Sequence, residues 1–162
     1  MALHRRGPDC LPASKFFLFL LLAIYFPVNF IRLYAGGSDE IFDFTFVVAD
    51  TILFYTFVFA VLRFFQVQRR FIQTAIALLG TDIFINLLGV PIAIGGSSVT
   101  NESSTISVFT ILYLVLFLWW LDISGFIVSK AIKQPYVVGV MFVILYVMAT
   151  LSILTSLTQA PA

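Results

Sequence analysis

Four aspartates lie inside long apolar segments of the chain: Asp43, Asp50, Asp82 and Asp122. A carboxylate at the centre of a lipid bilayer costs at least ~2.5–3.5 kcal/mol on insertion scales, so each of these residues needs a physical reason to be there. Three reasons are open. The carboxyl groups are protonated and hydrogen-bonded within the chain, or they bind a cation, or they pair with a positive charge on a partner protein.

Asp50 and Asp82 are the leading candidates for a functional site, because each lies at the middle of its own apolar segment. The two segments are joined by a short connection and run antiparallel, so both acids reach a similar depth and can face each other. Helical spacing places Asp82 on one polar face with Asn86 and Gly89. Thr81 lies beside that face. If the acids are hydrogen-bonded within the chain, then Asn86, Thr81 or a backbone carbonyl is the expected partner.

Asp122 and Asp43 are expected at other depths. Asp122 shares a helix face with Gly125 and lies about 7–8 Å to the cytoplasmic side of mid-segment, at 1.5 Å per residue. This is where an ion leaving the level of Asp50 would be relayed. Asp43 lies near the outer end of its segment, and Arg32 lies near the outer end of the segment before it. The two are predicted to form an ion pair at the outer edge.

The composition predicts the elements that must position these residues. Of the 162 residues, 61% are hydrophobic and 10% are charged, whereas a soluble domain is roughly 45–50% apolar and about 25% charged. A helix needs about 20 mostly apolar residues to cross a bilayer. The chain therefore predicts an all-α integral membrane bundle of five transmembrane helices, at residues 16–34, 41–62, 71–94, 106–128 and 136–157.

The basic residues predict the orientation of this bundle. Eight of the nine Lys and Arg residues fall in the N-terminal segment and in the second and fourth connections, while the first and third connections contain none. By the positive-inside rule, the N-terminus is cytoplasmic and the C-terminus is outside. The predicted organisation is a basic cytoplasmic segment at 1–15, a single membrane domain at 16–157 and a short outer tail at 158–162.

Several function classes do not fit the residues present. One cysteine and one histidine cannot build a zinc, haem or iron–sulfur site. No Ser-His-Asp arrangement or phosphate-binding glycine loop is visible, so an enzyme is not expected. The net charge of +1 offers no basic surface for nucleic acid. We therefore expect no cofactor, no metal and no nucleic-acid partner.

Two stretches resemble the Yip1 superfamily of five-span membrane proteins, including its small bacterial members. They are Arg70–Pro91 (RFIQTAIALLGTDIFINLLGVP) and Leu118–Ile132 (LWWLDISGFIVSKAI). The resemblance implies a non-enzymatic membrane protein that acts through contacts with partners or with itself. It favours the bacterial inner membrane, with a eukaryotic endomembrane as the alternative.

Two functional hypotheses follow. In the first, the bundle binds or organises partner proteins in the membrane, through its polar, small-residue helix faces. In the second, it is a small cation- or proton-translocating transporter or channel subunit that uses Asp50 and Asp82 to bind the ion. The two differ in geometry. Acids that face each other across one water-accessible cavity favour transport, and acids that point out of the bundle favour a partner.

Overall fold

The chain folds into five long helices in the computed structural model, which describes residues 14–36, 40–97 and 108–158. These ranges contain no strand, so the predicted all-α class is confirmed for them. Most of the predicted N-terminal segment and of the predicted outer tail lies outside the described residues. The elements are α1 (Lys15–Gly36), α2 (Glu40–Phe64), the short 3-10 helix η2 (Gln68–Arg70), α3 (Phe71–Ser97), α4 (Val108–Ile132) and α5 (Tyr136–Thr158).

Four of these helices carry apolar stretches long enough to cross a membrane: Lys15–Ala35, Phe44–Phe64, Gln68–Gly96 and Val108–Ile132. The apolar stretch of α5, Tyr136–Ser152, is shorter. Large apolar side chains are exposed on every helix, as expected where lipid rather than water surrounds the bundle. By length and composition, these helices support the coarser prediction, an integral membrane protein.

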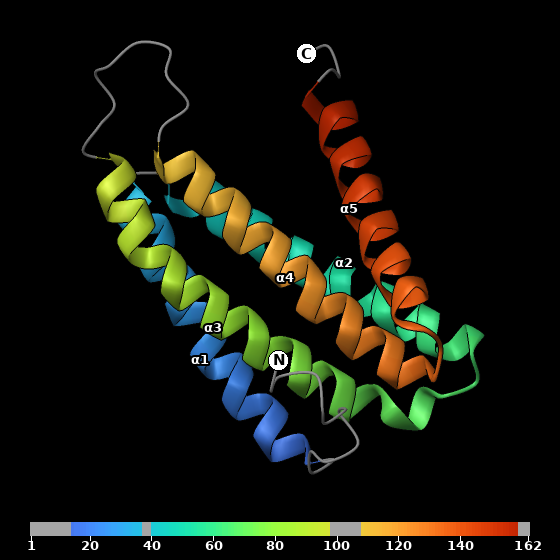
Figure 1. The fold of residues 1–162 in the computed structure, drawn as a ribbon. Helices are drawn as coiled ribbons and strands as arrows, with labels where there is room; N and C mark the ends of the chain where they lie inside the picture. Colours follow the sequence, from blue (N-terminus) through green and yellow to red (C-terminus); the bar gives the residue numbers. More distant parts are fainter. Residues whose placement is uncertain (1–13, 37–39, 98–107, 159–162) are drawn as a thin grey trace.

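The helices pack as a series in which α1 lies against α3, α3 against α4 and α4 against α5. Figure 1 shows α1, α3 and α4 side by side with similar axis directions, whereas α5 leans away from α4 towards its C-terminal end. The other end of α5 stays close to α4. The bundle is therefore tight at one end, near the α2–α3 and α4–α5 connections, and wider at the other.

The hydrophobic core lies at the tight end. It is formed by the second halves of α2 and α4 and the first halves of α3 and α5, which meet there because consecutive helices run antiparallel. Leu62, Leu78, Ala131 and Val143 are each at most 2% exposed. Apolar packing of this kind leaves few voids among these core side chains.

Two glycines permit the close crossing of α4 and α5. A methyl group added to Gly139 would meet the carbonyl oxygen of Gly125 and the backbone nitrogen of Ser129. A methyl group added to Gly125 would meet the backbone of Val140. The face of α4 that carries Gly125 is therefore packed against α5 of the same chain.

The two connections at the tight end close their helices in the same way. Gln66 has φ 58° and Lys133 has φ 57°, both in the left-handed region. The N–H of the next residue then reaches back to a helix carbonyl, from Val67 to Leu62 at 2.8 Å and from Gln134 to Ser129 at 3.0 Å. This six-to-one hydrogen bond is the Schellman pattern, which ends a helix sharply and lets the chain reverse.

Candidate functional site

A cavity of about 580 Å³ lies in the bundle, and all five helices line it. Two of the predicted acids, Asp50 of α2 and Asp82 of α3, lie on its wall together with Asn86. Arg32 of α1 lines the same cavity. Asn29 of α1 also lines it, so the structure brings together two carboxylates, two amides and a guanidinium in a space that is otherwise mostly apolar and aromatic.

The two acids of this cavity and two of the aromatic residues that donate to them form a layer near the middle of their helices. Asp50, Asp82, Trp120 and Tyr146 are 10–14 residues from the tight ends of their helices, which is about 15–21 Å at 1.5 Å per residue. Sequence spacing predicted this shared depth for the two acids. The packed core lies below the layer, and the cavity extends from it towards the wider end.

Asp82 is held by two ring donors. The indole N–H of Trp120 donates to Oδ1 at 2.6 Å, and the hydroxyl of Tyr55 donates to Oδ2 at 3.2 Å. The residue is 8% exposed, so each carboxylate oxygen has a hydrogen-bond donor where water is scarce. Such charge-assisted bonds fix the side chain and offset part of the cost of burial.

Asp50 is held in a similar way by α5. The hydroxyl of Tyr146 lies 2.5 Å from Oδ1 of Asp50 and 3.1 Å from its backbone oxygen. Tyr146 is itself 5% exposed and packs on Phe54, with ring centroids 4.9 Å apart. Asp50 and Asp82 both line this cavity, so the two acids belong to one site.

A third hydroxyl links α1 to α2 in the same cavity. Thr51 donates to the carbonyl of Val47 at 2.6 Å, so its oxygen accepts from Tyr25, which lies 3.2 Å away. Tyr25 lines the same cavity as Asp50, Asp82 and Arg32.

Arg32 reaches this cavity from α1. An added methyl on Gly89 of α3 would lie 3.5 Å from Cδ of Arg32, so the glycine leaves space for the arginine stem. Its Nε atom is buried and has no hydrogen-bond partner among the described residues. The predicted ion pair of Arg32 with Asp43 is untested, because the Asp43 side chain lies outside the described residues.

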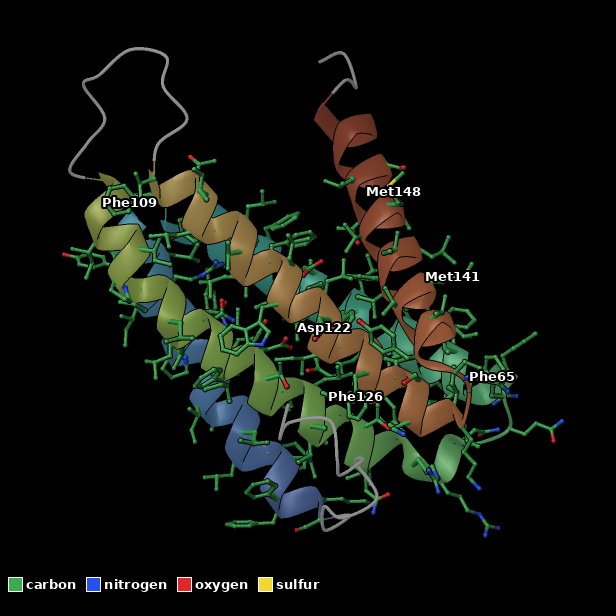
Figure 2. The ribbon with its side chains drawn as sticks, viewed as in Figure 1. Phe65, Phe109, Asp122, Phe126, Met141 and Met148 are labelled. Carbon is green, nitrogen blue, oxygen red and sulfur yellow. The ribbon has the colours of Figure 1, made fainter. Side chains whose placement is uncertain are left out.

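The other predicted site residues lie elsewhere. Thr81 donates its hydroxyl to the backbone of Ala77 at 3.0 Å and does not line the cavity. Asp122 is also absent from the cavity wall. It accepts a hydrogen bond from the hydroxyl of Tyr136, at the start of α5, and Figure 2 labels it on the half of α4 nearer the tight end.

Sequence reasoning missed the ring donors. Trp120, Tyr55 and Tyr146 are not among the candidate residues that the sequence indicated. A signal was present, because a tyrosine hydroxyl or an indole N–H in the middle of an apolar span needs a hydrogen-bond partner. Asp50 and Asp82 are acidic acceptors at a similar depth, so they are natural partners for these donors.

The arrangement suits the binding of positive charge without a metal cage. In the described part of the chain, no group of three or more His, Cys, Asp or Glu residues is placed to hold a metal ion. Two carboxylates and one guanidinium leave the cavity with a formal charge of −1 when all are ionised. Low local polarity strengthens the attraction of this charge for a cation or a proton.

Comparison of the chain with family models, with curated proteins and with solved structures finds no match. The functional argument therefore rests on the geometry of the cavity.

Proposed function

We propose that all five helices cross the membrane and that the tight end of the bundle is cytoplasmic. The basic residues of the connections support this orientation, since Arg63, Arg69, Arg70, Lys130 and Lys133 belong to the tight end. Positive charge is enriched on the cytoplasmic side of membrane proteins. In this orientation the cavity occupies the outer half of the bundle, and the core closes the cytoplasmic half.

In this orientation, the protein acts as a transporter or a channel subunit and translocates a small solute that carries positive charge. The observation that carries the proposal is that Asp50 and Asp82 line one cavity. Carboxylates buried in a membrane protein are expensive and usually mark a path for ions, protons or substrates. Acids that served to attract a partner protein would point out of the bundle instead.

Partner organisation is supported less well. The small-residue faces that suggested it are covered by the chain's own helices, because Gly125 contacts α5 and Gly89 lies beside Arg32 of α1. Ala75, on the same face of α3 as Asp82, is 2% exposed. Binding of membrane partners, self-association, the Yip1 resemblance and the bacterial inner membrane stay predictions from the sequence.

Translocation requires the tight end to open after the solute has bound. The crossing of α4 and α5 is the natural pivot, since α5 already leans away from α4 at its far end (Figure 1). A change in this crossing would move Tyr146, and with it the hydroxyl that holds Asp50. Solute binding at the acids and the position of α5 are thereby linked.

Charge movement in reconstituted vesicles tests this function. Purified protein in liposomes on a solid support is exposed to rapid jumps of Na⁺, K⁺ or pH, and the transient current is recorded. We expect a current that Asp50→Asn and Asp82→Asn each reduce strongly. Asp122→Asn is the matched control, because this acid lies outside the cavity, and it should keep most of the current. A current that is absent in the native protein, or unchanged in both cavity variants, would overturn the proposal.

A further inference from the structure

We propose that the solute is a small amino-acid-like zwitterion, whose ammonium group binds at Asp50 and Asp82 and whose carboxylate binds Arg32. This inference rests on the proposed transport function and narrows it to a substrate class. It accounts for all three charges of the cavity, whereas a proton or an inorganic cation would use only two of them.

The guanidinium is the feature that an inorganic cation leaves unexplained. Arg32 lies on the cavity wall with a buried Nε that has no hydrogen-bond partner among the described residues. A positive charge beside a cation site weakens the binding of that cation. A guanidinium matches a carboxylate through paired, planar hydrogen bonds, so an arginine that shares a cavity with two acids suits a ligand that brings a carboxylate.

The positions along α1 separate the two ends of the ligand. Arg32 is seven residues beyond Tyr25, which is about 10 Å farther along the helix axis towards the wide end of the bundle. Tyr25 is joined to Thr51, the residue after Asp50. The acids therefore lie at the level of the mid-depth layer, while the arginine reaches the cavity from the outer side. A zwitterion bound between them would point its ammonium group inwards.

The size and lining of the cavity fit an organic molecule. Its volume of about 580 Å³ lies within the roughly 300–1,000 Å³ of small-molecule sites. Phe54, Trp120 and Tyr146 form a continuous aromatic wall beside the acids, with ring centroids 5.8 Å and 4.9 Å from that of Phe54. Aromatic faces attract an ammonium group and also accommodate an apolar side chain.

The charges also explain why transport would be coupled to an ion. A bound zwitterion adds no net charge, so the formal charge of −1 that the cavity carries is still uncompensated. The ammonium group, bound between Asp50 and Asp82, balances one of their two negative charges, and a cation or proton that binds with the solute balances the other. The zwitterion and the ion would bind together, and each would raise the affinity for the other.

Tryptophan fluorescence tests the ligand class. The chain has two tryptophans, and Trp119→Phe leaves Trp120 as the single fluorescent reporter. Its indole nitrogen lies 2.6 Å from Oδ1 of Asp82. Trp119 does not line the cavity. Glycine, leucine and phenylalanine are titrated into the full-length protein, and each is compared with the amine that lacks its carboxylate and the acid that lacks its amine. We expect at least one zwitterion to bind about tenfold more tightly than both of its analogues.

Two variants assign the ends of the ligand. Arg32→Gln should abolish the preference for the zwitterion over the amine, and Asp50→Asn should weaken both. Equal binding of amine and zwitterion, or a preference that survives Arg32→Gln, would overturn the zwitterion proposal. The zwitterion proposal would also be overturned if no fluorescence response were seen while the currents that depend on Asp50 and Asp82 persisted. In that case the transport function would still stand. Binding of the zwitterion without any current would instead contradict the transport function.

Discussion

The two acids of the cavity are placed by the residues that donate to them. A carboxylate in an apolar bundle is stable only if its oxygens accept hydrogen bonds, and the ring donors of α2, α4 and α5 supply these bonds. Tyr55, Trp120 and Tyr146 are rigid aromatic side chains, so they hold the acids in one orientation. The donors therefore prepare the acids for a ligand before it arrives.

Trp120→Phe tests how much the hydrogen bond from the indole of Trp120 to Asp82 stabilises the protein. Phenylalanine keeps the packing on Phe54 and Phe117 but removes the donor to Asp82, which should cost about 1.5–3 kcal/mol of unfolding free energy. Stability is measured by SDS titration of the protein in mild detergent. The adjacent Trp119→Phe is the control, and it should change stability by about 0.5 kcal/mol or less, since Phe can keep the edge contact with Phe84. Equal losses in the two variants would show that the indole bond to Asp82 is unimportant.

Among the elements, the crossing of α4 and α5 determines the shape of the cavity. The helices touch at Gly125 and Gly139 and diverge beyond them, so the cavity opens on the far side of this contact. Met141 and Met148 lie on the outer side of α5 (Figure 2), where they are 63% and 60% exposed. α5 is thus held by one of its faces, near one of its ends, and this allows it to move as a unit.

Gly139→Ala should destabilise the bundle by about 1–3 kcal/mol, because the added methyl overlaps the backbone of α4 and forces the helices apart. Gly80→Ala is the matched control. It also adds one methyl to a helix, but nothing lies within 4 Å of that position, and alanine favours a helix by about 0.5–1 kcal/mol over glycine. The prediction is contradicted if both substitutions change the SDS midpoint in the same direction.

The connection between α2 and α3 offers a second test at this scale. Gln66 adopts a left-handed conformation that costs a non-glycine residue about 1–2 kcal/mol. Gln66→Gly should therefore stabilise the protein by about 0.5–1 kcal/mol, after the greater freedom of glycine in the unfolded chain is subtracted. Gln68→Gly, two residues later in η2, is the control. Gln68 has no left-handed conformation to relieve, so this substitution should not increase the stability of the protein.

At the scale of the whole molecule, the helices were predictable and the cavity was not. Apolar segments of about 20 residues and the mid-segment positions of Asp50 and Asp82 follow from the order of residues alone. The rotation and tilt of each helix depend on contacts between helices, such as that of Gly125 with Gly139. For this reason the sequence did not reveal that Trp120 faces Asp82, that Arg32 shares the cavity or that Asp122 lies away from it.

The proposed orientation predicts the side of the membrane on which the C-terminus and the α2–α3 connection lie. A reporter enzyme that is active only outside the cytoplasm should be active when fused after Ala162 and inactive when inserted at Gln68. A reporter that is active only in the cytoplasm should show the reverse pattern. If both fusion sites report the same side, one helix does not span the membrane, and the cavity cannot face the outer side as proposed.

Thiol accessibility on α5 tests the central claim most directly, that the cavity is filled with water from the outer side. The Cys10→Ser variant has no cysteine, and single cysteines are introduced into it at two adjacent positions of α5. Val147 lines the cavity, whereas Met148, at the same depth, is exposed on the face of α5 that is turned away from the bundle. A membrane-impermeant thiol reagent added outside should label Val147→Cys and leave Met148→Cys unlabelled in lipid. Equal labelling of the two, or no labelling of Val147→Cys, would contradict a water-filled cavity open to the outer side.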